Sequence, residues 1–190
     1  MKLFRIFFAA ILVLFTAPSL AAEDFDALIE KTMKDWQVPG ASIAIVRGEE
    51  IVLLKGYGYR DVEKKLPATE KTLFRLASTT KSFTAATVAA LVTQGKLEWN
   101  MPVQSYLPEL RFYNDELTAK VTPVDMLSHR TGLPRHDAVW YYNRDFGRED
   151  LIRRLRYLET SKPLREAWQY NNFMFLLAGY MAAVSYTHLR

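Results

Sequence analysis

The stretch Phe74-Arg75-Leu76-Ala77-Ser78-Thr79-Thr80-Lys81-Ser82-Phe83 opens the one segment of this chain that has the composition of a long buried helix. No charged residue lies between Ser82 and Gly95, and glycine is the residue that most often ends a helix. Lys81 is followed, at the spacing of one helix face, by the small apolar residues Ala85, Val88, Ala89 and Val92. We therefore expect a helix that ends at Gly95 and that turns Lys81 toward the interior.

Ser78 and Lys81 are one helical turn apart, which suits a serine nucleophile and its base. A serine hydroxyl attacks a carbonyl only when another group takes its proton, and a charged lysine cannot do so. Burial and the positive end of a helix dipole disfavour the ammonium form, so we expect Lys81 to be neutral part of the time. If Ser78 begins the helix, its backbone N–H can also bind a developing oxyanion. The structural alternative is a surface lysine, but Lys81 interrupts an apolar face, which favours catalysis.

The composition is that of an ordinary globular protein. Of 190 residues, 49% are hydrophobic and 24% are charged. Lys2 and Arg5 supply two of the four net positive charges, and elsewhere acidic and basic residues are interspersed, so we expect no binding to nucleic acid. The absence of cysteine excludes a thiol nucleophile, a lipid-anchored cysteine and a disulfide.

Residues 1–21 have the pattern of a bacterial-type secretory signal peptide. Two basic residues precede an apolar run that ends at Ala17, and small residues then lead to an acidic pair. The apolar run is shorter than a transmembrane helix requires, so an uncleaved anchor is the less favoured alternative. We expect cleavage after Ala21 or Ala22, a periplasmic or extracellular protein, and no membrane span in the remaining chain.

The segment that follows predicts one helix and one hairpin. Apolar residues recur at helical spacing over residues 24–36, and Val38-Pro39-Gly40 ends that pattern. Two apolar runs that contain β-branched residues, 41–46 and 51–58, flank a tight turn at residues 47–50. An antiparallel hairpin is the simplest arrangement of these two strands.

Two further helix signals lie in the second half of the chain. Thr122 is a suitable N-cap, Pro123 suits the first helical position, and Asp125 completes a capping box. Residues 148–159 have apolar residues at helical spacing and four arginines. We interpret these arginines as a solvated outer face rather than a binding site.

Tyr170-Asn171-Asn172 precedes an apolar segment, residues 173–181, that predicts a buried helix. At the start of such a helix, the Tyr170 hydroxyl and the Asn172 carboxamide could face a cleft. The alternative is structural, with Tyr170 packed in the core and Asn172 capping the helix. A second Tyr-x-Asn step begins at Tyr141, but no apolar helix follows it, so we prefer Tyr170.

No pattern in the sequence indicates a metal or a cofactor. His129, His136 and His188 lack the spacing of metal ligands, and no acidic cluster accompanies them. Gly56-Tyr57-Gly58 lacks the third glycine of a phosphate-binding loop. We therefore expect neither a metal nor a cofactor.

Three motifs in this order resemble those of the serine β-lactamase and penicillin-binding-protein superfamily, in its branch of class C β-lactamases and D-alanyl-D-alanine carboxypeptidases. They are Ser78-Thr79-Thr80-Lys81, Leu127-Ser128-His129-Arg130-Thr131-Gly132-Leu133-Pro134 and Tyr170-Asn171-Asn172. The resemblance extends from about residue 25 to about residue 183. It implies an α+β, β-lactamase/transpeptidase-like fold, in which an antiparallel sheet is flanked by helices and a mostly helical lobe is inserted.

The resemblance also implies a role for each candidate residue. Ser78 would be the acylated nucleophile, Lys81 its base or proton partner, and Tyr170 the group that exchanges protons with the nucleophile and leaving group. Asn172 would donate a hydrogen bond to a small-molecule or peptide substrate. The implied activity is hydrolysis of a β-lactam, a D-amino-acid peptide or an ester. A non-turnover protein that binds penicillin or cell-wall fragments, and an inactive fragment, are the alternatives.

The chain departs from the family pattern in several places. The family's Lys-Thr-Gly or His-x-Gly motif does not occur, and the closing strands of the sheet, which would follow the Tyr170 helix, are absent. Arg165-Glu166-Ala167 stands where relatives often have Pro-Gly, and residues 184–190 do not resemble the family's continuation. Our hypothesis is an incomplete domain over residues 22–190, from a truncated gene model, whose last residues, about 184–190, are foreign to the family. The sequence indicates no oligomeric state.

Overall fold

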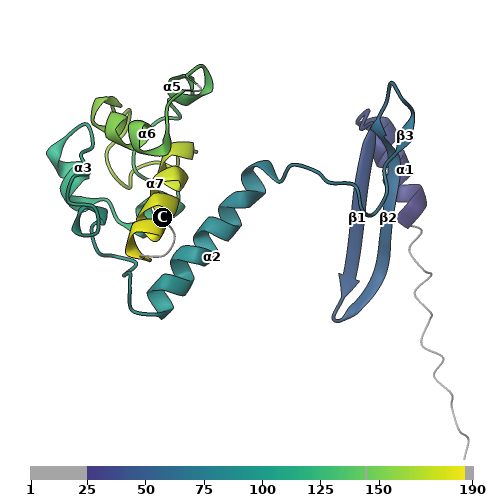
Figure 1. Ribbon diagram of the computed structural model, residues 1–190, viewed down its shortest axis with the longest axis horizontal. Coiled ribbons are helices and arrows are strands. Elements are labelled where there is room, and N and C mark those ends of the chain that lie inside the picture. Colours follow the sequence, from purple (N-terminus) through teal and green to yellow (C-terminus); the bar gives the residue numbers. More distant parts are fainter. Residues whose placement is uncertain (1–24, 144, 187–190) are drawn as a thin grey trace, which may run out of the picture. The chain divides into compact units, whose positions relative to one another are not determined.

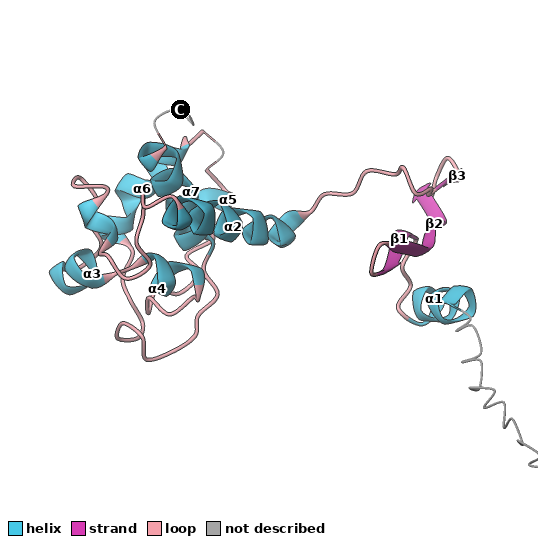
Figure 2. Cartoon of the chain, turned by 90° about the horizontal axis from the view of Figure 1, so that it is seen from below, coloured by secondary structure: helices cyan, strands magenta, loops and turns pink. Residues whose placement is uncertain are grey.

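The computed structural model describes residues 25–143 and 145–186, so the predicted signal peptide lies outside the described residues. The chain divides into two compact units on either side of the bond between Arg75 and Leu76. The first unit contains one helix and a small sheet, and the second is helical (Figures 1 and 2). Within the described residues, no helix has the length and apolar character needed to cross a bilayer.

The first unit contains the predicted helix and hairpin. Helix α1 (Phe25–Asp35) is followed by the antiparallel strands β1 (Gly40–Arg47) and β2 (Glu50–Asp61), which confirms both predictions. The connecting turn contains Gly48 with a φ of 62°, a conformation that glycine adopts at no steric cost. A short strand β3 (Leu66–Pro67), which the sequence pattern did not predict, pairs with the other edge of β2 to give the order β1-β2-β3.

Asp26 joins α1 to β2. Tyr57 Oη donates a hydrogen bond to Asp26 Oδ1 at 2.5 Å, and Lys55 Nζ donates to Asp26 Oδ2 at 2.8 Å. Burial and the hydrogen bond to the carboxylate raise the pKa of Tyr57 to about 12. The tyrosine therefore stays protonated and remains a donor to Asp26 throughout the physiological pH range.

The second unit is built around one apolar helix. Helix α7 (Asn172–Ser185) packs against α2, α4 and α6, and most of its apolar side chains are buried in the core. The elements before it are η1 (Ala77–Thr79), α2 (Thr80–Thr93), η2 (Val103–Ser105), α3 (Asp115–Lys120), α4 (Pro123–Leu127), α5 (Ala138–Tyr141), α6 (Arg148–Arg154) and η3 (Leu155–Tyr157).

The end of α2 and the start of α4 follow the sequence signals. Gly95 has a φ of 70°, and the N–H groups of Gly95 and Lys96 donate to the carbonyls of Val92 and Leu91, which is a Schellman cap. At α4, Thr122 and Asp125 form the predicted capping box. Both helix boundaries are set by local chemistry, because each cap is made within a few residues of the boundary.

The predicted helix over residues 148–159 is shorter than expected. Helix α6 ends at Arg154, and the tighter turn η3 continues the segment to Tyr157. Ile152, Leu155 and Leu158 are nevertheless buried, as the apolar spacing indicated. A short turn of this kind commonly ends an α-helix, and it keeps these side chains on the core side.

Candidate active site

Ser78 and Lys81 lie where the chain enters α2. Ser78 belongs to the 3₁₀ turn η1, and α2 begins two residues later at Thr80, so the condition that Ser78 begins the helix is not met. Ala77, the first residue of this turn, has a φ of 45°, and short 3₁₀ turns are frequent at the N-termini of α-helices. Lys81 Nζ donates to Ser78 Oγ at 3.2 Å. Lys81 is half-buried, whereas Ser78 is exposed. The hydroxyl is therefore open to a ligand, with an amine beside it.

Tyr170 supplies the second partner of the serine. Ser78 Oγ and Tyr170 Oη are 2.6 Å apart, which is hydrogen-bonding distance, and Lys81 Nζ lies 4.7 Å from the centroid of the Tyr170 ring. Contacts with Lys81 and Ser78 and the charge of Arg135 lower the pKa of Tyr170, against the opposing effect of burial. Tyr170 therefore loses its proton at a lower pH than an ordinary tyrosine, which suits a group that exchanges protons.

Asn172 is the first residue of α7, and its side chain faces Lys81. Lys81 Nζ donates to Asn172 Oδ1 at 2.8 Å. The structural alternative gave Asn172 the role of helix cap, but Asn171 has that role, because its Oδ1 accepts from the N–H of Met174 at 3.0 Å. Since the neighbouring asparagine caps the helix, the Asn172 carboxamide is left to contact the lysine.

His129 fixes the chain just before α7. Its ring is 8% exposed, and its Nδ1 accepts a hydrogen bond from the backbone N–H of Asn171 at 3.1 Å. The ring centroid lies 4.7 Å from that of Tyr170 and 5.1 Å from that of Phe175. Burial and the nearby charge of Lys81 lower the pKa of His129, so the imidazole is neutral at pH 7. A neutral imidazole ring therefore packs against the Tyr170 ring.

Asp137 is a site residue that the sequence reasoning missed. It accepts hydrogen bonds from Arg135 Nε at 2.6 Å, Trp140 Nε1 at 3.0 Å and Asn172 Nδ2 at 3.1 Å. Burial works to raise its pKa, but these hydrogen bonds and the charge of Arg135 hold the pKa of Asp137 below its usual range. The available signal was a charged segment, residues 135–137, directly after the second motif.

A pocket of about 460 Å³ opens beside the predicted nucleophile. Ser78, Lys81 and Asn172 contribute its polar lining. Its remaining lining residues are apolar, namely Ala77, Trp140, Leu151, Phe173 and Leu176. The described parts of the chain contain no group of three or more His, Asp or Glu side chains that could hold a metal ion. What the site offers is a hydroxyl, an amine, a phenol and a carboxamide next to an apolar wall.

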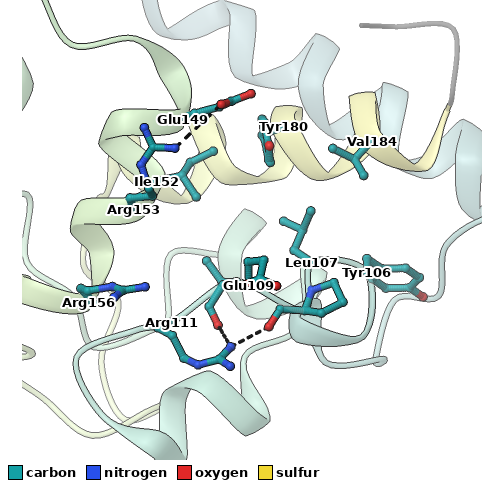
Figure 3. Close-up of a pocket in the computed structure, with 12 residues that line it drawn as sticks. Tyr106, Leu107, Glu109, Arg111, Glu149, Ile152, Arg153, Arg156, Tyr180 and Val184 are labelled. Atoms are coloured by element: carbon teal, nitrogen blue, oxygen red, sulfur yellow. Dashed lines mark hydrogen bonds and ion pairs between the residues drawn. The ribbon is translucent and has the colours of Figure 1, made fainter.

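A second pocket, of about 440 Å³, lies between α6, α7 and the segment after η2 (Figure 3). Two of its three arginines, Arg111 and Arg153, have structural partners. Arg111 Nη1 donates to the carbonyls of Pro108 and Leu110 at 2.6 and 2.7 Å, and Arg153 pairs with Glu149 at 3.9 Å. We therefore place the candidate active site at Ser78 and not in this pocket.

The chain matches one protein family over most of its length. The family model described as Beta-lactamase matches residues 25–188. Among curated proteins, the Unguisins hydrolase ungD' of Aspergillus campestris is 37% identical over 167 residues, which are 84% of this chain and 31% of that protein. The chain thus spans about a third of the length of this relative.

Solved structures give the same result. The octameric penicillin-binding protein homologue from Pyrococcus abyssi is similar with a TM-score of 0.72 and 28% identity, over 85% of this chain and 38% of that one. The D-amino acid amidase from Ochrobactrum anthropi SV3, complexed with D-phenylalanine, has a TM-score of 0.70 and 29% identity, over 86% of this chain and 46% of that one. These matches confirm the predicted β-lactamase/transpeptidase-like fold.

Proposed function

This chain belongs to the β-lactamase family, as its motifs predicted, and from that premise we propose that it is a serine hydrolase that forms an acyl-enzyme on Ser78. The observation that supports the proposal most directly is the position of the Ser78 hydroxyl. Its oxygen lies 2.6 Å from Tyr170 Oη and 3.2 Å from Lys81 Nζ. Two groups that can carry a proton therefore contact one nucleophile, which is the arrangement that acyl transfer by serine requires.

In the first step, Lys81 as the free amine or Tyr170 as the phenolate takes the Ser78 proton, and Oγ bonds to the substrate carbonyl carbon. The carbonyl π electrons move onto oxygen and form a tetrahedral oxyanion. When this intermediate collapses, the bond to the leaving amine or alcohol breaks, and the proton returns to that leaving group. Tyr170 Oη lies 2.6 Å from Ser78 Oγ, so we assign the delivery of this proton to Tyr170.

In the second step, water hydrolyses the ester on Ser78. The same base accepts a proton from the attacking water, and Ser78 leaves as the hydroxyl after it regains a proton. Asn172, which contacts Lys81, lies at the pocket edge, where its amide can donate to a substrate carbonyl. The helical unit therefore supplies the nucleophile and two groups that can transfer protons in both half-reactions.

The substrate we propose is an amide or ester of a D-amino acid, or a β-lactam, with an apolar group on its acyl part. The apolar lining beside Ser78, which includes Trp140 and Leu176, supports this choice because it can bury such a group. We also propose that the protein is exported, on the signal-like pattern of residues 1–21.

The test is covalent labelling with a fluorophosphonate probe followed by mass spectrometry. We expect the mass shift on the peptide that contains Ser78, and loss of labelling in Ser78→Ala. The matched control is Ser82→Ala, because Ser82 is a serine four residues further along, in α2, whose hydroxyl donates to the carbonyl of Thr79. Labelling that persists in Ser78→Ala would refute the proposal.

Turnover separates the hydrolase from the binding alternative. We expect steady hydrolysis of nitrocefin, p-nitrophenyl acetate or D-phenylalanine amide by the protein, and none by its Ser78→Ala variant. Acylation of Ser78 without further turnover would instead assign a penicillin-binding or sensing protein.

A further inference from the structure

Asn172 lies between two groups of opposite charge character. Lys81 Nζ donates to its Oδ1 at 2.8 Å, and its Nδ2 donates to Asp137 Oδ1 at 3.1 Å. A carboxamide has one acceptor end and one donor end, so it can satisfy both neighbours in one orientation only. Turning the amide by 180° would place its N–H groups against the lysine and its oxygen against a carboxylate.

The carboxylate of Asp137 is committed to this contact. Asp137 occupies the N-cap position of α5, where an aspartate usually accepts from the N–H groups of its own helix. It makes no such cap bond here. Its oxygens accept from Asn172, Trp140 and Arg135 instead, and the exposed fraction of its side chain is 23%. A side chain that could cap its own helix is therefore directed at the site.

We propose that Asp137 is a positioning residue that fixes the amide orientation of Asn172 and, through it, the place of the Lys81 amine beside Ser78. This inference rests on the proposed acyl transfer, because it assigns a part in that reaction to a residue that touches neither the nucleophile nor the pocket. The ionised carboxylate can only accept, so it selects the donor end of the amide. The acceptor end of the amide is then held toward Lys81. The Nζ atom of Lys81 lies 3.2 Å from Ser78 Oγ.

The residues around Asp137 restrict the position of its carboxylate and thereby the orientation of the Asn172 amide. Arg135 and Trp140 each donate to the carboxylate, so its own position is fixed from two further sides. The Arg135 guanidinium also lies 5.1 Å from the centroid of the Tyr170 ring. The segment of residues 135–140 therefore supports the asparagine directly, and the same arginine that holds the carboxylate contacts the tyrosine.

The test is a double-mutant cycle on the rate of Ser78 acylation by the fluorophosphonate probe. Asp137→Ala is expected to slow acylation by about 10- to 100-fold, the effect of leaving an orienting hydrogen bond unmade. If Asp137 acts through Asn172, adding Asp137→Ala to Asn172→Ala changes the rate less than twofold. Asp150→Ala is the matched control, because Asp150 lies in the first turn of the short helix α6 and pairs with Arg153, but is not among the residues of the site.

A merely structural role gives a different result. Equal losses from Asp137→Ala in the wild-type and the Asn172→Ala backgrounds would overturn the inference, as would a wild-type rate in Asp137→Ala. If Asp137→Ala fails to fold, Asp137→Leu keeps about the size of the side chain and has no hydrogen-bond acceptor. It is expected to give a loss of acylation in the folded protein, and an unchanged rate would overturn the inference.

A readout that needs no catalysis separates this inference from the proposed function. In ¹⁵N–¹H spectra, the Asn172 side-chain amide is expected to give two well-dispersed, slowly exchanging signals that move and exchange faster in Asp137→Ala. If Ser78 is never acylated but these signals behave as expected, the proposed function fails and the positioning of Asn172 stands. If the signals are the same in both proteins, the positioning fails even though Ser78 is acylated.

Discussion

Ser78 Oγ and Tyr170 Oη lie 2.6 Å apart although 92 residues separate them in the chain. This contact exists because α7 packs against α2, and because His129 and Asn171 hold the segment that leads into α7. Lys81 reaches the same hydroxyl from within the helix itself. The candidate site therefore combines one contact that helix geometry provides with one that depends on tertiary packing.

Replacing the amine at position 81 tests the proton transfer. In Lys81→Arg the side chain keeps its charge, but a guanidinium does not lose its proton at working pH. Acylation of Ser78 by the fluorophosphonate probe is expected to fall by about 10²- to 10⁴-fold, the usual contribution of a general base. Lys120→Arg, in an exposed pair with Glu116, is the control and should keep the wild-type rate. A Lys81→Arg protein that retains a tenth of that rate would contradict the assignment.

Removing only the hydroxyl of Tyr170 separates its chemistry from its packing. Tyr170→Phe keeps the ring contact with His129 but loses the oxygen 2.6 Å from Ser78. Hydrolysis of p-nitrophenyl acetate is expected to drop by about 10²- to 10⁴-fold, with little change in melting temperature. If Phe at this position supports the full rate, Tyr170 has no part in proton transfer.

The pH dependence of acylation follows from the direction of the Tyr170 shift. Its pKa lies below the ordinary value of 10.0, chiefly because of Lys81 and Ser78. The phenolate is the basic form, so the rate should rise with pH and level off below pH 10, above the lowered pKa. In Tyr170→Phe this limb should disappear. A pH–rate profile of Ser78 acylation measures both, and an identical limb in the two proteins would assign the titration to another group.

Asp125 makes the stability of the helical unit dependent on pH. Its side chain is fully buried and accepts from Arg130 at 2.7 Å and from Arg165 at 2.9 Å. Burial acts to raise the pKa of Asp125, but the hydrogen bonds from Arg165, Thr122 and Arg130 lower this pKa by more, so the net shift is downward. Since both arginines are partly exposed and therefore screened, we expect Asp125→Asn to reduce the free energy of unfolding by about 2 kcal/mol at pH 7.

The sign of the pH effect at Asp125 follows from linkage. A carboxyl whose folded pKa is depressed stabilises the fold above its unfolded value of about 3.9, and that contribution is lost as the pH falls through the folded pKa. The difference between wild-type and Asp125→Asn should therefore be full at pH 7 and shrink below pH 4. Denaturant unfolding at several pH values measures it, and a constant difference would show that Asp125 is not the responsible group.

Arg165 has a backbone conformation that favours glycine. Its φ is 69°, and its guanidinium donates to both oxygens of Asp125 at 2.9 Å, so the ion pair offsets the cost of the conformation. Arg165→Ala loses the pair and keeps the strain, whereas Arg165→Gly loses both. We expect the glycine variant to be more stable than the alanine variant by about 1 kcal/mol in denaturant unfolding.

The neighbouring position provides the control for Arg165. Glu166 is not among the residues with positive φ, so alanine there should be at least as stable as glycine. If alanine is preferred to glycine at both positions, the conformation at Arg165 carries no cost. The positive φ also gives a physical reason why the family pattern, from which this chain departs here, often has Pro-Gly at this point.

The sequence was sufficient wherever a structure depends on residues close together in the chain. The pair Ser78 and Lys81, the cap at Gly95 and the capping box at Thr122 each depend on spacings of a few residues, and each was predictable. The start of α2 was less predictable, because a pattern of apolar residues does not distinguish the 3₁₀ turn η1 from the first turn of an α-helix.

Asp137 shows why part of the site could not be predicted. As a sequence feature it is an aspartate before a short helix, and the local expectation for such a residue is a cap. Its actual partner, Asn172, lies 35 residues away and is brought to it by the packing of α7. Capping α5 and accepting from Asn172 would both satisfy the hydrogen-bonding capacity of the Asp137 carboxylate. Only the folded chain shows which of the two occurs.

By itself, the sequence determined the one-turn spacing of Ser78 and Lys81, the caps of two helices, the hairpin and the family. These follow from chemistry that acts over one turn of helix or one strand pairing, so the order of residues contains them. Tertiary structure decided which tyrosine meets Ser78, that Asn171 and not Asn172 caps α7, and that Asp137 faces Asn172. Those choices depend on which helices bury their apolar faces against one another, and no spacing within the chain specifies that.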